Sequence, residues 1–204
     1  MRRFHRKDRK VQQAAPLPRL WLFTDPRIPE ARLLEALTDL PRGSGLVFRH
    51  YELEPTERRA LFERVEKIAR RRGLWLLFGD AGDGLTPGPR RIDGLHVPRW
   101  RRRGHRPARP APGMLLSLSA HAGRDIIAAR RAGANLLFLS PVFATRSHPG
   151  AHSLGPLRFG LLARGAGTTV IALGGMNRKR FQQLRPLGAQ GWAAIDALSH
   201  QRTG

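Results

Sequence analysis

The repeated alternation of short apolar segments with amphipathic segments constrains the fold of this chain most. Eight apolar segments of strand length are predicted, and most of them are separated by a stretch with helical periodicity. They cover residues 20–25, 45–51, 74–80, 94–97, 114–119, 135–140, 168–173 and 192–195. This pattern is typical of a parallel sheet with crossover helices, and we predict an α/β protein, a (β/α)8 TIM barrel. A doubly wound open sheet is the alternative, but no Gly-x-Gly-x-x-Gly follows the first strand.

The segments that connect the strands differ in how clearly they are predicted to form helices. Helices are predicted at residues 30–40, 55–72, 124–132 and 178–187, with a short one after Gly155 and with Thr56 as a capping candidate for the second. The segments on both sides of the fourth strand, 81–93 and 98–113, are rich in proline and glycine, which predicts shortened or irregular crossovers there. We expect three regions along the chain. They are a disordered basic arm at residues 1–18, a barrel at 19–198 and a tail at 199–204.

Composition limits the class of protein. At 204 residues and 41% hydrophobic content, the chain has room for one barrel-sized domain with a substantial core. No apolar run is long enough to span a bilayer, and the basic N-terminal stretch lacks the apolar segment of a secretory signal. The absence of cysteine excludes a disulfide framework and a thiol nucleophile. We therefore expect a cytoplasmic protein with no membrane partner.

The net charge of +22 is unusual for a chain of this length. It results from 37 Lys and Arg residues against 15 Asp and Glu residues, with clusters at 1–10, 70–72 and 99–109. Such a field attracts polyanions, whether phosphorylated metabolites or nucleic acid. Solvated loops and a solvated arm explain the clusters equally well. Nucleic acid is not the favoured partner, because the chain has no zinc-finger spacing, aromatic RNA-binding signature or Gly-x-x-Gly clamp.

Three strand ends carry the side chains that indicate chemistry. The segments are Ser117-Leu-Ser-Ala-His121, Phe138-Leu-Ser-Pro-Val-Phe-Ala-Thr145 and Val170-Ile-Ala-Leu-Gly-Gly-Met176. In a parallel α/β barrel, the carboxyl ends of the strands face the active site. The glycine pair at the third strand end lets backbone amides approach a phosphate, although a tight turn uses glycine for its positive φ as well.

Together these segments resemble the thiamine phosphate synthase/TenI family, from about Leu20 to Leu198. Members of this family have a Ser-x-His element, a Gly-Pro-x-Phe-x-Thr element and an Ile-Gly-Gly element in this order. The resemblance implies a TIM barrel in thiamine biosynthesis that couples a pyrimidine methyl pyrophosphate to a thiazole phosphate and releases pyrophosphate. It also implies small phosphorylated heterocycles as substrates and Mg²⁺ as cofactor, because departing negative charge must be stabilised.

The resemblance assigns roles residue by residue. Arg49 matches an arginine after the second strand and would clamp pyrophosphate, and Asp80 matches a metal-binding aspartate after the third strand. Ser119 would contact the pyrimidine, and His121 matches a histidine that moves protons in TenI-type thiazole tautomerases. The expected phosphate-binding positions are Thr145, Ser147, His148, Gly174 and Gly175. Structural roles, namely a salt bridge for Arg49 or Asp80 and helix capping for His121, are the alternatives.

The chain departs from the family pattern mainly in the pyrophosphate and metal half of the site. Val47 and Tyr51 replace a glutamine and a lysine, and Gly79 replaces an asparagine. Cations stand at 98–102, where a second metal-binding aspartate is expected, and Asp196 replaces a small hydroxyl residue. One carboxylate binds Mg²⁺ weakly, and the arginines at 98–102 offer a direct partner for pyrophosphate instead. We therefore predict a synthase with reduced activity.

Two alternatives remain. The first is a TenI-like thiazole tautomerase or a binder of a phosphorylated heterocycle. The second is a non-catalytic barrel that binds nucleic acid or another polyanion through residues 1–18 and 99–109.

Overall fold

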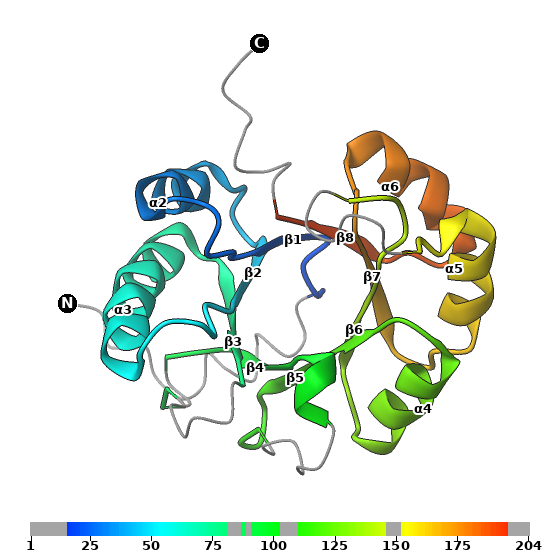
Figure 1. Ribbon diagram of the computed structural model, residues 1–204, viewed down its shortest axis with the longest axis horizontal. Helices are drawn as coiled ribbons and strands as arrows, with labels where there is room; N and C mark the ends of the chain where they lie inside the picture. The colour runs from blue at the N-terminus through cyan, green and yellow to red at the C-terminus, as the bar shows by residue number, and fades with distance from the viewer. Residues whose placement is uncertain (1–15, 81–86, 89–90, 103–109, 146–151, 196–204) are drawn as a thin grey trace.

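Eight parallel strands form one closed barrel in sequence order, with β8 paired to β1 (Figure 1). This computed structural model describes residues 16–80, 87–88, 91–102, 110–145 and 152–195. The strands are β1 (Leu20–Phe23), β2 (Gly45–Phe48), β3 (Trp75–Gly79), β4 (Gly94–Val97), β5 (Leu115–Ala120), β6 (Leu136–Leu139), β7 (Thr169–Leu173) and β8 (Gly191–Ala194). The predicted TIM barrel is confirmed.

Five α-helices lie outside the barrel in the described part of the chain. They are α2 (Glu30–Asp39), α3 (Pro55–Arg72), α4 (Gly123–Arg131), α5 (Gly155–Arg164) and α6 (Arg178–Leu184). In Figure 1, α2 and α3 cover one side of the barrel and α4, α5 and α6 cover the other. Among the described residues between β3 and β5, only the short 3-10 helix η1 (Arg99–Arg102) is helical, which confirms the irregular crossovers around the fourth strand. A second 3-10 helix, η2 (Arg185–Leu187), ends the predicted last helix.

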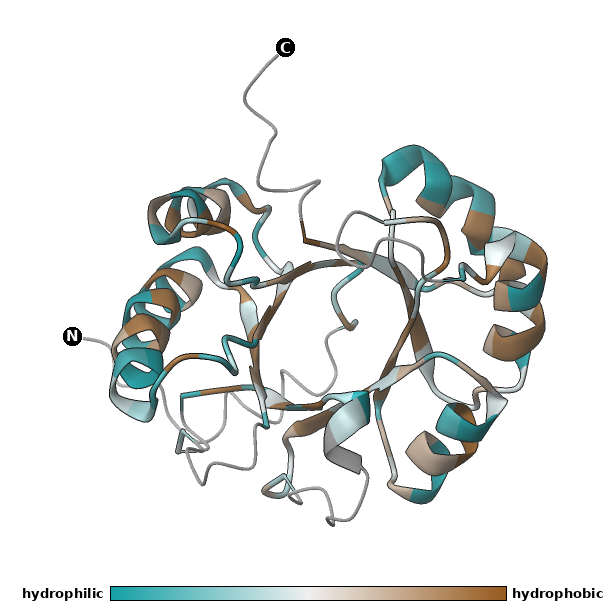
Figure 2. Ribbon diagram, in the orientation of Figure 1, coloured by the Kyte–Doolittle hydropathy of each residue, from teal (hydrophilic) through white to brown (hydrophobic). Residues whose placement is uncertain are grey.

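The barrel interior is packed with alternate residues of the strands, because successive side chains of a strand point to opposite faces. The interior cluster consists of Trp21, Phe23, Val47, Leu77, Leu136, Phe138, Ile171 and Ala193. Three of these rings meet edge to face, with Phe138 lying 5.5 Å from Trp21 and 4.7 Å from Phe23 between centroids. The strands are largely brown in Figure 2, and every residue of β2, β4 and β6 is buried, as expected for a parallel sheet covered on both faces.

Local sequence explains where the longest helix begins and ends. Pro55 occupies the first turn of α3, and Gly73 ends it with a left-handed φ of 63°. Thr56 therefore lies inside the first turn, and the prediction that it caps this helix is wrong.

Ahead of β1, Leu17 packs against the barrel interior and the Trp21 indole donates a hydrogen bond to the Pro18 carbonyl at 2.7 Å. None of the described helices combines the length and the apolarity that a membrane span requires.

Candidate active site at the barrel mouth

The strand ends place most of the predicted site residues around one opening of the barrel, here called the mouth. Arg49 follows β2, Asp80 follows β3, and Ser119 lies near the end of β5. Gly174 directly follows β7. All strands of the barrel are parallel, so their carboxyl ends meet at the same opening, as in barrel enzymes generally.

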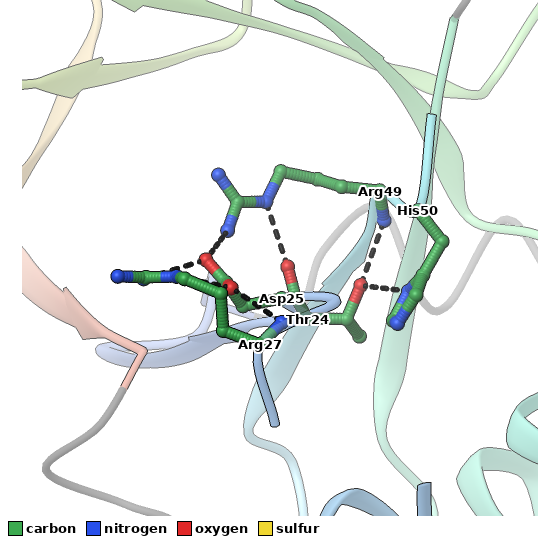
Figure 3. A network of polar contacts seen from close by, with 5 residues as sticks. All are labelled: Thr24, Asp25, Arg27, Arg49 and His50. Carbon is green, nitrogen blue, oxygen red and sulfur yellow. Dashed lines mark hydrogen bonds and ion pairs between the residues drawn. The ribbon is translucent and has the colours of Figure 1, made fainter. Parts of the chain in front are cut away.

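Arg49 is held in place by residues that follow β1 (Figure 3). Its Nε donates to the Thr24 carbonyl at 2.8 Å, and a terminal nitrogen donates to Asp25 Oδ2 at 3.1 Å. The guanidinium also lies 5.3 Å from the centroid of the Phe23 ring. The salt bridge considered as an alternative for Arg49 therefore exists, and its partner is a residue that the sequence had not assigned to the site.

Asp25 is shared by two arginines. Arg27 donates to both carboxylate oxygens, from Nε to Oδ1 at 2.7 Å and from a terminal nitrogen to Oδ2 at 2.9 Å. Arg49 donates to Oδ2 as well, at 3.1 Å. Burial favours the neutral acid, but hydrogen bonds from Arg27 and the charge of Arg49 outweigh it, so the pKa of Asp25 lies below its ordinary value of 3.8. Asp25 is therefore ionised at neutral pH.

His50 turns the chain between Arg49 and Tyr51. Its φ of 43° is left-handed, which is uncommon for a residue other than glycine. The ring is buried, stacks on Phe48 and shares a hydrogen bond of 3.0 Å between Nδ1 and Thr24 Oγ1. Burial, followed by the nearby charge of Arg49, lowers the pKa of His50 below 6.5, so it adds no positive charge to the mouth at neutral pH.

Ser119 contacts a buried histidine in the barrel interior. His96 on β4 lies between two serines of β5, with Nδ1 2.9 Å from Ser117 Oγ and Nε2 3.2 Å from Ser119 Oγ. Ser117 Oγ donates to the Leu95 carbonyl at 3.3 Å, so it must accept from Nδ1. In the neutral ring, Nε2 then accepts the Ser119 proton, and the Ser119 oxygen keeps lone pairs for a donor at the mouth. The sequence analysis did not assign His96 to the site, although it lies in the Gly-x-His element of the fourth strand.

His121 lies between β5 and the start of α4. Asp125 accepts the backbone N–H of His121 at 2.8 Å and that of Ala122 at 3.1 Å, and Arg99 of η1 pairs with the same carboxylate at 3.4 Å. These bonds satisfy backbone donors at the start of the helix, so the Asp125 side chain caps α4.

The glycine pair after β7 packs directly against the loop that follows β6. Gly174 has a φ of 94°, and a Cβ there would lie 2.7 Å from Pro141 Cα. Gly175 has a φ of 60°, and its Cβ would lie 2.4 Å from the Ala144 carbonyl oxygen. Both the backbone conformation and the close approach require glycine. The pair thus joins the β7 end to the loop that leads to Thr145.

Tyr51 fills the space at the end of β3. A Cβ on Gly79 would lie 2.5 Å from the Tyr51 hydroxyl and 2.8 Å from the Phe48 carbonyl oxygen. Arg58 of α3 is fully buried beneath this point, 5.5 Å from the Tyr51 ring centroid, and it donates to the carbonyls of Arg49 and Gly79 at 3.1 and 2.6 Å. Trp100 meets the Tyr51 ring edge to face at 5.4 Å. The chain departs from the family pattern at Tyr51 and at Gly79, and the two residues lie side by side. The Tyr51 ring leaves no room for a side chain at position 79.

Among the described residues, Asp80 is the one carboxylate at the expected metal position. Asp80 provides a carboxylate after β3, but Arg99 and Trp100 follow β4, where a second carboxylate is expected. The residues that the structure describes contain no group of three His, Cys, Asp or Glu side chains placed to hold a metal. Mg²⁺ is usually bound by one or two carboxylates together with substrate phosphates and water, so Asp80 would hold it only with oxygen atoms of the substrate and of water.

Some predicted positions cannot be placed. Ser147, His148 and Asp196 lie outside the described residues, whereas Thr145 is described and half-buried at the end of the loop after β6. The arm at 1–15 and the cationic residues 103–109 also lie outside the described part.

Comparisons with known proteins identify the family of this chain. The profile of the family described as thiamine monophosphate synthase matches residues 20–198. The chain is 29% identical to the putative thiamine-phosphate synthase 2 of Aquifex aeolicus, over 88% of this chain and 96% of that protein. It is 27% identical to the thiamine-phosphate synthase of Chloroflexus aurantiacus, over 88% and 84%. The structure of thiamine phosphate pyrophosphorylase from Pyrococcus furiosus superposes with a TM-score of 0.70 at 19% identity, covering 91% of this chain and 89% of that one. The chain therefore belongs to the thiamine monophosphate synthase family.

Proposed function

We propose that this protein is a transferase of thiamine biosynthesis that couples a pyrimidine methyl pyrophosphate to a thiazole phosphate at the barrel mouth. One observation carries the proposal: Arg49, Ser119 and the glycine pair come from distant parts of a chain that matches the synthase family, and they lie at the ends of strands that open at the same mouth. Two phosphorylated substrates need positive charge and backbone amides at such a mouth.

Each residue has a role that its contacts support. Arg49, fixed by Thr24 and Asp25, binds the departing pyrophosphate and stabilises the charge that develops on it. Ser119, whose proton is engaged by His96, accepts a hydrogen bond from the pyrimidine. Gly174 and Gly175, with Thr145, bind the thiazole phosphate. In the synthase these residues bind, orient and stabilise charge, and none of them forms a covalent bond to the substrate.

The test is thiamine phosphate formation by the purified protein from pyrimidine methyl pyrophosphate and thiazole phosphate in the presence of Mg²⁺. A confirmed synthase serves as positive control. We expect product at an enzymatic rate, slower than the control, and loss of product in Arg49→Gln with the fold retained. Absence of product beside an active control contradicts the proposal.

A TenI-like tautomerase is the second candidate, because residues that differ from the family pattern of the synthases lie on one side of the mouth. Tyr51 and Gly79 alter the β2–β3 side, whereas Ser119, His121 and the glycine pair match the family. Proton exchange on a carboxythiazole phosphate, followed by NMR in deuterated water, tests this reading. The tautomerase predicts exchange that His121→Gln abolishes, while the synthase predicts coupling that survives this change at a reduced rate.

The remaining expectations stay predictions. Mg²⁺ dependence requires metal titration of the coupling reaction, since the donor set gives no resident metal site. Nucleic-acid binding through residues 1–18 and 99–109 is tested by a binding assay at several salt concentrations, because phosphate contacts weaken as salt rises. The cytoplasmic location and the three-region division of the chain are tested by fractionation and by limited proteolysis.

A further inference from the structure

The family pattern places a lysine and a second metal-binding aspartate near the pyrophosphate, and this chain has neither at the expected positions. Another group at the mouth must therefore supply positive charge to pyrophosphate. Burial raises the pKa of the Tyr51 hydroxyl well above its usual range, so this position is neutral where a lysine is expected. His50 is held neutral beside it, and the described residues around Asp80 do not complete a metal site. Any compensating positive charge near Arg49 must therefore come from another element.

Arg27, in the turn between β1 and α2, brings a second guanidinium group close to Arg49. It is joined to Arg49 through Asp25, since both guanidinium groups donate to the carboxylate Oδ2 of this one residue, at 2.9 and 3.1 Å. Two guanidinium groups therefore share the negative charge of this one carboxylate at close range. Half of the Arg27 side chain and about a fifth of the Arg49 side chain are exposed, at 50% and 22%, while Asp25 is exposed by only 9%.

The geometry restrains both guanidinium groups. The Arg27 backbone N–H also donates to Asp25 Oδ1 at 3.0 Å, so the carboxylate is fixed by its own turn before it binds either side chain. Arg49 uses two of its five N–H donors on Thr24 and Asp25, and in Figure 3 its other terminal nitrogen points away from both. A guanidinium with a locked orientation loses less entropy when it binds an oxyanion.

We propose that Arg27 and Arg49, positioned by Asp25, form a clamp that binds the pyrophosphate group of the substrate directly, without a metal held by the protein. This inference rests on the proposed function and adds to it a second binding residue, Arg27, and a positioning residue, Asp25. Asp25 acts through the two arginines and does not touch the substrate.

The experiment is isothermal titration calorimetry of the full chain with inorganic pyrophosphate in buffer containing EDTA, and in buffer containing Mg²⁺. We expect wild-type protein to bind in EDTA. Arg27→Gln should bind about tenfold to a hundredfold more weakly, which corresponds to the loss of a charge-assisted hydrogen-bonded contact. Arg27→Lys keeps the charge but not the two-point bond to Asp25, and it should recover part of this loss.

Arg32→Gln is the matched control, because it removes the same charge from an exposed arginine of α2 that pairs with Glu35. The control should bind as wild type does, and thermal unfolding verifies that each variant is folded. Binding that occurs only with Mg²⁺, or equal affinities of the Arg27 and Arg32 variants, overturns the clamp. Pyrophosphate binding as expected without thiamine phosphate formation overturns the proposed function and leaves the clamp intact. Product formation that Arg27→Gln does not affect overturns the clamp alone.

Discussion

Replacing Gly79 by alanine tests whether the end of β3 is as crowded as the structure indicates. The added Cβ would lie 2.5 Å from the Tyr51 hydroxyl, 2.8 Å from Tyr51 Cε1 and 2.8 Å from the Phe48 carbonyl oxygen. Contacts this short force side chains or backbone to move, and overpacking of this kind costs about 1–3 kcal/mol. For a chain of this size, that loss lowers the melting temperature by about 3–10 °C.

The measurement is thermal unfolding by circular dichroism, with Gly88→Ala as control because a Cβ at Gly88 meets nothing within 4 Å. A second arm adds Tyr51→Ala to Gly79→Ala. Removing the tyrosine eliminates two of the three short contacts but leaves the Phe48 carbonyl, so the double variant should be more stable than the sum of the two single changes predicts, by about 1 kcal/mol. A Gly79→Ala protein as stable as the Gly88→Ala control, or strictly additive effects, would refute the crowding argument.

Three further predictions concern other parts of the mouth. Gly175→Ala should lower stability and weaken binding of thiazole phosphate, because the φ of 60° and the Ala144 carbonyl oxygen, 2.4 Å from the added Cβ, both oppose a side chain. Gly43→Ala is the control: its φ of 76° is equally strained, but the added Cβ meets nothing within 4 Å. Comparing the two variants in unfolding and binding measurements separates backbone strain from the steric clash. His50 has a folded-state pKa below 6.5, so its contribution to stability is present above pH 6.5 and is lost as the pH falls through the folded-state pKa. Urea unfolding across pH 5–7.5 should therefore show a free energy of unfolding that rises with pH. The rise should be smaller in His50→Asn, a replacement chosen because asparagine tolerates the left-handed backbone. Ser119→Ala should lower kcat/KM for the pyrimidine substrate about tenfold in steady-state assays, and an unchanged value would remove Ser119 from the site.

The sequence predicted the architecture well because its signals are local. Each strand is a short apolar run, and each helix has its own periodicity and terminal residues, such as Pro55 and Gly73 of α3. The strand ends were less accurate. The segment predicted as strand to Tyr51 pairs only as far as Phe48, because the chain turns at His50 with a positive φ that no hydrophobic pattern reveals.

In the candidate site, the positions of the residues at the strand ends were predictable from the sequence, whereas their hydrogen-bond partners were not. Motif order was enough to place Arg49, Ser119 and the glycine pair at strand ends, and closure of the barrel then brings those ends to one mouth. The partners of these residues were not readable in advance. His96 lies 23 positions from Ser119, and Asp25 lies 24 positions from Arg49.

The sequence by itself determined an alternating α/β chain with polar and glycine residues at the carboxyl ends of its strands, because periodicity and turn residues act over a few positions. Only the tertiary structure decided that Asp25 joins Arg27 to Arg49, that His96 is hydrogen-bonded to Ser119, and that Tyr51 fills the space above Gly79. The predicted barrel already makes consecutive strands neighbours. It leaves open the register of each pair and the conformations of the side chains at the strand ends, which depend on packing between residues far apart in the sequence.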